Sequence, residues 1–470
     1  MVTKDEKKIV VVEANEIPLR IFRRYAERYP NSTIARLLKD SLVTETMATD
    51  VSEASLYPSQ TWASLNTGVP YEKHRIYFYN DNKAADYPFY WEIVANQGYS
   101  VGLVSSLHSS PAKRYAHSPG IKFLIPDCFA EDDQTKPHLF EVFQRVNLKH
   151  TEANKRVASS KLGVGLDEVK LLLASPSLGL CPKTILAVSA LLGKILVKRA
   201  NRERVRVIQF MFAKDIFMKN LKSHDVQLGI FFTNHVAANM HRYWYALFPE
   251  DYETSPFDLH WIEKYKDEIF YSVEVLDEFL GELRRFCDET HRVLIVVTSM
   301  GQCANPSLDK SQKQDIVIES LPILLRRLGI DDTKCDILSA MVPEYTLRFQ
   351  DSGTATSALS RFVSCQSDRL HFSPTLRDTV LTIHLSADAT CDSYDIDGST
   401  LSLSDLGFRK VVVDDSHAGQ HHPRGSLIIY GSKTAEKRSE LIDYLEYAPA
   451  MCGYFNIARR DYMQTPTLAF

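Results

Sequence analysis

The strongest constraint on the fold is the alternation of short apolar runs with longer helical patterns. Six apolar runs are typical of buried strands, at residues 8–14, 99–106, 227–235, 291–301, 409–417 and 425–431. Helical patterns separate most of these runs, for example at residues 88–98, 256–287 and 319–329. Strands that alternate with helices predict an α/β fold, with a central, mostly parallel sheet and helices on both of its faces.

Two segments interrupt this alternation. Residues 129–226 have a helical pattern and are expected to form a capping insertion, and residues 331–400 predict a smaller strand-and-loop subregion rich in Ser, Thr and Asp. The α/β core is therefore expected to consist of three segments, at residues 1–128, 227–330 and 401–470. Within the insertion, the basic run 197–206 indicates either a solvated helix face or a site for an anionic ligand.

Composition excludes several classes of function. A net charge of −4 gives no overall attraction to nucleic acid, so no nucleic-acid partner is expected. The eight cysteines form no CxxC pair, which suits a reducing cytosol, and residues 1–15 lack the apolar core of a secretory signal. The longest apolar run, 184–198, is interrupted by Lys194 and is too short to cross a bilayer. We therefore expect a cytoplasmic protein with no membrane span.

Polar residues follow four of the apolar runs, where the strands are expected to end. They lie at residues 15–16, 233–235, 299–300 and 416–417. Because ligands of open α/β sheets bind at the carboxyl ends of the strands, this edge is the expected site. The candidates for binding an oxygen-rich small molecule or saccharide are Asn15, Glu16, Asn234, His235 and His422. Trp244 is a candidate wall for a sugar ring, with a core position as the alternative, and Asp81 is either a site carboxylate or a turn residue.

The stretch 57–81 crowds hydroxyl side chains in front of a small-residue helix. Ser59 and Thr61 are candidates for a catalytic nucleophile. The alternative is that they cap the helix that follows, because Ser and Thr accept hydrogen bonds from the free N–H groups of a first helical turn.

Several motifs in this order resemble the alkaline phosphatase superfamily, particularly its type I phosphodiesterase and predicted phosphohydrolase branches. Residues 62–74 resemble the nucleophile turn and the helix after it, through Thr67-Gly68, Pro70 and His74. Residues 88–106, 421–431 and 445–457 resemble the next helix and strand, the late His-x-Pro-x-Gly segment and the closing helix. The resemblance implies an alkaline-phosphatase-like fold in which a hydroxyl attacks phosphorus or sulfur beside two metal ions.

The metal ligands that the resemblance implies are mostly replaced in this chain. Asn15 stands where an aspartate should end the first strand, Ala237 where the Asp-x-x-x-His motif should begin, and Ser299-Met300 where an Asp-His pair should lie. His241 and His421 fall on matching ligand positions. An ungapped alignment puts Pro58 at the nucleophile position, and shifts of one or three residues bring Ser59 or Thr61 there.

Three arrangements of this site remain open from the sequence. One is a single divalent metal ion, zinc or manganese, bound by His241, His421 and a third ligand, either His417 or Glu16. Another is a metal-free site in which His241 or His421 is the general acid or base. The third is a solvent-facing histidine-rich turn at residues 417–422.

Two functions follow from these arrangements. The first is a hydrolase or group transferase that acts on a phosphate- or sulfate-bearing small molecule or saccharide precursor. The alternative is a catalytically silent binding or regulatory protein that keeps the scaffold and recognises an anionic or carbohydrate ligand. A shared scaffold does not decide between them, because functional sites are grafted onto common folds.

Overall fold

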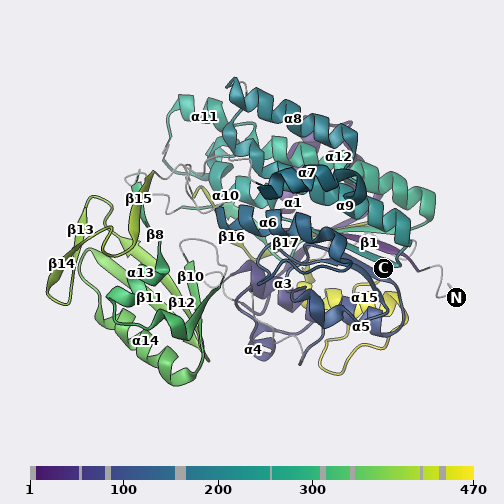
Figure 1. Ribbon diagram of the computed structural model, residues 1–470. Coiled ribbons are helices and arrows are strands. Elements are labelled where there is room, and N and C mark those ends of the chain that lie inside the picture. The colour runs from purple at the N-terminus through teal and green to yellow at the C-terminus, as the bar shows by residue number, and fades with distance from the viewer. Residues whose placement is uncertain are drawn as a thin grey trace. The chain divides into compact units, whose positions relative to one another are not determined.

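The computed structural model describes most of the chain, at residues 7–51, 56–79, 86–153, 166–198, 200–254, 257–306, 314–338, 344–412, 417–432 and 441–470. The chain divides into two compact units (Figure 1). Unit 1 consists of residues 1–147, 164–308 and 417–470, and unit 2 consists of residues 148–163 and 309–416.

Unit 1 is built on an eight-stranded sheet. Its strands follow the spatial order β18 (Ile442–Asp443), β2 (Leu42–Met47), β17 (Arg424–Tyr430), β6 (Val293–Val297), β1 (Ile9–Ala14), β5 (Leu228–Thr233), β3 (Val101–Val104) and β4 (Ile121–Ile125). β1 pairs in parallel with β5 and β6, whereas β17 is antiparallel to both of its neighbours. The prediction of a mostly parallel central sheet is therefore confirmed.

Helices cover both faces of this sheet, because alternate side chains of its strands are apolar on each side. Val10 and Val12 of β1 pack into one core, and Ile9 and Val11 pack into another. The first core includes α1 (Leu19–Arg28), α2 (Thr33–Asp40), α6 (Glu141–Ala153), α9 (Val207–His224), α10 (His235–Leu247), α11 (Leu259–Tyr265) and α12 (Glu268–Thr290). The second includes α3 (Pro58–Thr67), α5 (Tyr90–Asn96) and α15 (Tyr447–Tyr454), which lie below the strands in Figure 1.

Short elements complete unit 1. They are α4 (Tyr71–His74), the antiparallel ribbon of β7 (Gly301–Ala304) and β16 (Gly419–His422), and the 3-10 helices η4 (Ala112–Tyr115), η5 (His138–Phe140), η6 (Arg202–Arg206), η7 (Pro249–Asp251) and η9 (Tyr444–Glu446). The segment expected to be a helical insertion contains α6, α7 (Leu166–Leu178), α8 (Pro182–Leu196) and α9.

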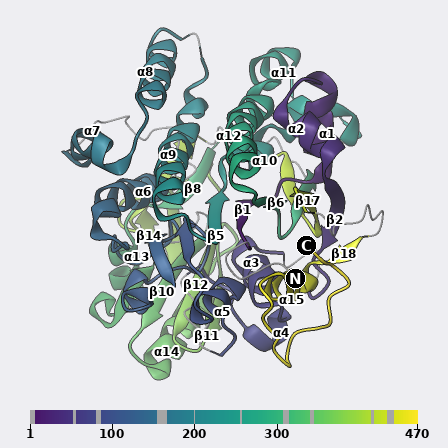
Figure 2. The same ribbon diagram turned by 90° about the vertical axis from the view of Figure 1, so that its right-hand side faces the viewer.

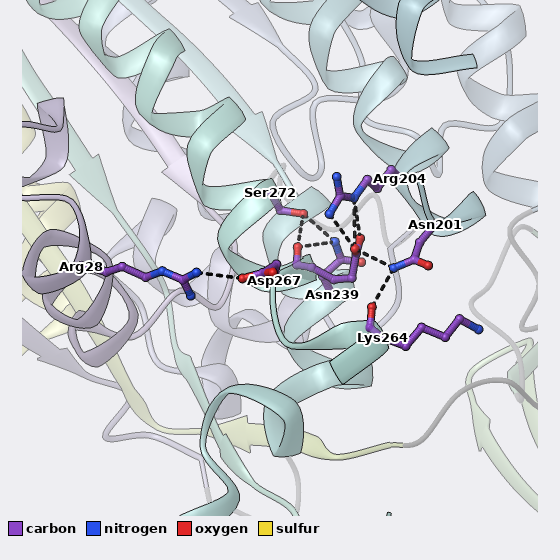
Figure 3. Close-up of polar contacts among 8 residues, drawn as sticks. Arg28, Asn201, Arg204, Asn239, Lys264, Asp267 and Ser272 are labelled. Atoms are coloured by element: carbon purple, nitrogen blue, oxygen red, sulfur yellow. Dashed lines mark hydrogen bonds and ion pairs between the residues drawn. The ribbon is translucent and has the colours of Figure 1, made fainter. Parts of the chain in front are cut away.

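A buried ion pair fixes the end of the α7–α8 segment to α12. Glu268 is 1% exposed, and Arg204 of η6 donates to both of its carboxylate oxygens at 2.8–3.0 Å (Figure 3). Asn201 adds a hydrogen bond of 2.8 Å to the same carboxylate. Arg204, which belongs to the basic run 197–206, is thus paired with a buried carboxylate of unit 1.

Unit 2 has its own sheet and core. The antiparallel order is β11 (Leu370–Arg377), β12 (Val380–Ala387), β10 (Glu344–Phe349) and β9 (Cys335–Leu338). The other elements are β8 (Gln314–Ile318), α13 (Leu321–Arg327), η8 (Asp332–Lys334), α14 (Ser352–Ser364), β13 (Ser393–Ile396), β14 (Ser399–Ser402) and β15 (Phe408–Val412). Leu347, Phe362 and Leu381 lie in its core.

Unit 2 is larger than the subregion expected at residues 331–400. The apolar run 409–417, expected as a strand of the central sheet, instead contributes to β15, which pairs with β8 in unit 2. An apolar run indicates a strand but does not specify the strand that it pairs with. Residues 309–330 and 401–416, which were expected in the α/β core, belong to unit 2 instead.

Candidate functional site

The end of β1 places a carboxylate inside unit 1. After Ala14 the chain turns, and the Ile17 N–H donates to the Ala14 carbonyl at 3.4 Å. Glu16 within this turn has a φ of 59°, a left-handed conformation that is uncommon for a residue with a side chain. The Glu16 residue is only 2% exposed. Uncommon backbone conformations of this kind concentrate at functional sites.

The β7–β16 ribbon brings two side chains to this carboxylate. Gln302 and His421 are directly opposite each other in the antiparallel register, so their side chains point to the same face of the ribbon. The Gln302 amide donates to Glu16 Oε2, and His421 Nε2 lies 3.5 Å from the same oxygen.

Helix α10 supplies the second imidazole. His241 Nε2 lies 2.9 Å from Glu16 Oε2, and its Nδ1 lies 3.0 Å from the carbonyl oxygen of Gly419. His421 is oriented in the same way, with Nδ1 3.0 Å from the carbonyl oxygen of Leu56. A carbonyl oxygen can only accept a hydrogen bond, so Nδ1 carries the proton in both rings and both Nε2 atoms face Glu16.

The surroundings keep Glu16 ionised. Burial alone would raise the pKa of this carboxyl group. When both rings are protonated, the positive charges of His421 and His241, with hydrogen bonds from His241 and Gln302, outweigh burial and lower the pKa of Glu16 to about 2. Asn15 Nδ2 also donates to Glu16 Oε1 at 2.7 Å. A carboxylate is therefore present at this position at neutral pH.

The three side chains fit the requirements of a metal ion. One donor atom from each of Glu16, His241 and His421 lies within 4.8 Å of the other two. Two imidazoles and one carboxylate form a donor set that suits zinc and is acceptable to manganese. Hydrogen bonds from Nδ1 to backbone carbonyls are also typical of metal-binding histidines, because they fix the ring and its tautomer.

The carboxylate comes from a different element than the sequence resemblance implies. Ala237 occupies the position of the expected aspartate on α10, and its carbonyl accepts a hydrogen bond of 3.3 Å from Gln302. Glu16 at the end of β1 provides the carboxylate instead. Sequence reasoning missed Gln302, because only the register with His421 brings it to Glu16.

Asn15 and Asn234 form a hydrogen-bonded frame beside this group. Asn15 Nδ2 donates to Asn234 Oδ1 at 2.8 Å, and Asn15 Oδ1 accepts from Trp62 Nε1 at 2.7 Å. Asn15 thereby links the end of β1 to α3 and to the start of α10. Its amide orients Glu16, whereas direct binding of a substrate was the expectation.

His235 and Trp244 lie in the core, which corrects their expected substrate-binding roles. Both ring nitrogens of His235 have protein partners, Thr233 Oγ1 at 2.6 Å and the Ser272 carbonyl at 3.0 Å, and burial lowers its pKa to about 4. Trp244 is 1% exposed and donates to Asp251 at 2.9 Å. The helical spacing of aromatic residues in the sequence does not show whether they line a ligand site or pack into the core.

The other two histidines of the 417–422 stretch do not belong to the three-donor group. His422 alternates with it along β16, so its side chain points to the opposite face, where its Nδ1 accepts from the Arg424 N–H at 3.2 Å. His417 precedes β16 and is not a member of the three-donor group. Glu16 is therefore the better third ligand, in place of His417.

The two candidate nucleophiles lie in the first turn of α3, and both are fully buried. The Ser59 hydroxyl donates to the Tyr77 carbonyl, and Thr61 Oγ1 lies 2.8 Å from Ser299 Oγ. The N-cap of α3 is Tyr57, so neither hydroxyl occupies the capping position that was the alternative role. Asp81 lies outside the described residues.

Ser64 and His74, in the same stretch of sequence, form a hydrogen bond. Its direction does not suit catalysis, because the histidine donates to the serine and cannot accept the serine proton. His74 Nδ1 accepts from the Ile76 N–H at 2.9 Å, so Nε2 carries the proton and donates to Ser64 Oγ at 2.8 Å. The Ser64 hydroxyl then donates to Asp50 at 2.9 Å. Burial lowers the pKa of His74 to about 3, so this histidine is neutral and structural.

Comparisons with known proteins give similarity in structure alone. No family model matches the chain, and no curated protein matches it in sequence. Murine ectonucleotide pyrophosphatase / phosphodiesterase 5 is similar at 11% identity and a TM-score of 0.41, over 98% of each chain. Phosphonoacetate hydrolase from Sinorhizobium meliloti 1021 is similar at 12% identity and a TM-score of 0.42, over 96% of each chain.

Similarity at this level leaves the function to be inferred from the side chains of this chain. Within the described residues, no helix is both long and apolar enough to span a membrane.

Proposed function

We propose that this chain is a hydrolase or group transferase that acts on a phosphate- or sulfate-bearing small molecule or saccharide precursor. The observation that carries this proposal is the convergence of His241 Nε2 and His421 Nε2 on the ionised carboxylate of Glu16. These three groups would hold one divalent cation, zinc or manganese. When bound, such a cation supplies positive charge that neutralises the oxygens of a phosphoryl or sulfuryl group.

The remaining residues position this group and supply a hydroxyl. Gln302 and Asn15 hold the two oxygens of Glu16, and the backbone carbonyls of Gly419 and Leu56 hold the imidazoles. Thr61 is our candidate for the attacking hydroxyl, because besides the Pro58 carbonyl at 3.3 Å it contacts the Ser299 hydroxyl at 2.8 Å, which can accept and pass on a proton. Ser59 is less suitable, because its proton is committed to a backbone carbonyl.

One observation favours the binding-protein alternative. Thr61 is buried, so its hydroxyl meets a substrate only if the first turn of α3 moves. A silent protein would bind the cation and an anionic ligand at Glu16, His241 and His421 without turnover. The two functions therefore differ in turnover and share the cation.

Metal content and turnover measured together test the proposal. Elemental mass spectrometry of protein purified without chelator is expected to find near-stoichiometric zinc or manganese. The metal should be lost in His241→Ala and His421→Ala and kept in the matched control His422→Ala, which changes a neighbouring histidine on the other face of β16. A panel of phosphate and sulfate esters then separates the two functions. Absence of metal from the parent protein overturns the cation site, and metal without turnover of any ester supports the binding protein.

A further inference from the structure

Helices α7 and α8 of unit 1, called here the α7–α8 hairpin, expose several large apolar side chains. α8 has 15 residues, of which only Thr184, Val188 and Leu191 are buried, so a narrow stripe holds the helix to the protein. Leu186 is 71% exposed and Leu196 is 83% exposed. On α7, Leu173 is 78% exposed. A soluble protein that exposes several large apolar side chains together usually uses them for binding.

The charges of the same segment are mostly positive. From Leu166 to Arg202 the only acidic residues of the sequence are Asp167 and Glu168, at the start of α7, although the chain as a whole has a net charge of −4. Six basic residues lie in this stretch: Lys170, Lys183, Lys194, Lys198, Arg199 and Arg202. Lys183 and Lys194 are exposed on α8, together with its leucines. The hairpin is therefore both apolar and cationic.

The hairpin is firmly attached to unit 1 on its other side. Leu171, Leu178 and Val188 pack into the first core of unit 1, and the Cys181 N–H donates to Asp215 of α9 at 2.8 Å. The Arg204–Glu268 ion pair then fixes the chain just after α8 (Figure 3). Figure 2 shows α7 and α8 on the far side of α9 from β5. The exposed face thus belongs to a hairpin with defined anchors.

We propose that this hairpin docks unit 1 onto the surface of a membrane that contains anionic lipid. Leucines on one helix surface can enter the boundary between headgroups and acyl chains, while lysines beside them contact the anionic headgroups. The 15 residues of α8 span about 22 Å. This length is less than the hydrocarbon core of a bilayer, about 30 Å, so the hairpin lies on the membrane and does not cross it.

Charge also argues against a second copy of the chain as the occupant. A symmetric dimer through this face would bring the same lysines of both copies together, with no carboxylate on α8 and only Asp167 and Glu168 on α7 to compensate. An anionic lipid surface complements the charge and accepts the leucines. The proposal is independent of the function proposed for Glu16 and the two histidines.

Co-sedimentation of the full-length protein with lipid vesicles tests this proposal. Vesicles of equal parts phosphatidylserine and phosphatidylcholine are compared with vesicles of phosphatidylcholine alone. The parent protein is expected to sediment at least several-fold more with the anionic vesicles, and the difference should shrink as salt is added. Equal sedimentation with both vesicles, or none with either, overturns the proposal.

Matched variants separate the hairpin from the rest of the surface. The triple variant L173S/L186S/L196S and the charge variant K183E/K194E should each lose most of the binding to anionic vesicles. Controls with the same chemistry elsewhere are Leu259→Ser, whose side chain is 80% exposed on α11, and K39E/K73E, at two exposed lysines. Both controls should bind like the parent.

Sedimentation velocity measures the oligomeric state and so tests whether a second copy of the chain covers this face. Controls that lose binding as strongly as the hairpin variants overturn the proposal. So does a parent dimer that becomes monomeric in L173S/L186S/L196S, because the face would then be an interface between two copies. Circular dichroism of each variant identifies any loss of binding that comes from unfolding. The single variant Leu196→Ser, at the most exposed of the three leucines, then replaces the triple variant.

Discussion

Glu16 Oε2 lies 2.9 Å from His241 Nε2, although the Nδ1 atom of that ring already donates to a backbone carbonyl. An ionised carboxylate can only accept, so a neutral His241 would turn a lone pair toward Glu16. The contact is favourable in two situations: Nε2 carries a second proton, or a cation lies between the two groups. The Nε2 atom of His421 lies 3.5 Å from the same oxygen, so without a cation one carboxylate would have to pair with two protonated imidazoles. A divalent cation satisfies all three groups at once.

Glu16→Gln is expected to abolish stoichiometric metal binding. Glutamine is close in size but neutral, so the cation would lose the one negatively charged ligand of the three-donor group. Removal of a directly coordinating group should cost at least the 10–100-fold in affinity that is typical of losing a supporting hydrogen bond. Titration of the metal-free protein with zinc measures the affinity. Unchanged affinity in Glu16→Gln would exclude this carboxylate as a ligand.

Gly419→Ala tests the support of His241 without changing a ligand. A Cβ atom at Gly419 would lie 2.6 Å from the Met240 carbonyl oxygen and 2.9 Å from Gln302 Oε1, so β16 must move away from α10. The Gly419 carbonyl then loses its position beside His241 Nδ1. We expect zinc affinity to fall by about 10–100-fold while the protein stays folded. Gly453→Ala, where a Cβ would have open space, is the control and should keep the parent affinity.

Much of the fold was predictable from the sequence because it depends on local pattern. The apolar run 8–14 has the continuous hydrophobicity of a strand buried on both faces, and it became β1 at the centre of the sheet. The run 409–417 has the same character, yet it contributes to β15 in unit 2. Pairing partners depend on the whole chain, and a single apolar run does not encode them.

The site was predictable to a lesser degree. His241 and His421 were identified from motif positions, and the structure brings their Nε2 atoms to the same carboxylate. The third ligand was open between His417 and Glu16, and only the turn at Glu16 shows which one reaches the imidazoles. Gln302 had no signal of its own. Contacts that arise from strand register and turn conformation cannot be predicted from the spacing of residues in the sequence.

Thr61→Val distinguishes an enzyme from a silent binding protein. Valine keeps the shape of threonine in the buried first turn of α3 but removes the hydroxyl that contacts Ser299. We expect turnover of the best ester substrate to fall by at least about 10³-fold, with metal content unchanged. Ser59→Ala should leave turnover near that of the parent, because Ser59 donates to the Tyr77 carbonyl. The reverse pattern would assign the nucleophile to Ser59.

Arg204→Met is expected to destabilise unit 1 by about 3 kcal/mol, because it leaves the Glu268 carboxylate buried without its cation. The variant also removes the contact of the guanidinium with the Tyr271 ring, at 4.1 Å. Urea unfolding measures the change in the free energy of unfolding. The double variant Arg204→Met/Glu268→Gln should recover part of the loss, since no buried charge remains. A double variant less stable than Arg204→Met would show that the ion pair is not the cause.

The free energy of unfolding should depend on pH through the buried carboxyl group of Glu13. This residue is 1% exposed, and its carboxyl group accepts a hydrogen bond from Asn66 at 3.2 Å. Burial raises its pKa from 4.5 to about 7, against the smaller opposite effect of its polar neighbours Ser106 and Asn66. Between these two values the folded protein binds more protons than the unfolded chain, so the free energy of unfolding falls as pH rises.

This loss amounts to about 3 kcal/mol across the window. Glu13→Gln, which cannot ionise, should flatten the decline, so that the variant gains stability relative to the parent as pH rises through 7. Urea unfolding at several pH values across the window measures the difference, and Glu72→Gln, at an exposed glutamate, should follow the parent curve. Parallel curves for Glu13→Gln and the parent would mean that Glu13 keeps an ordinary pKa in the folded protein.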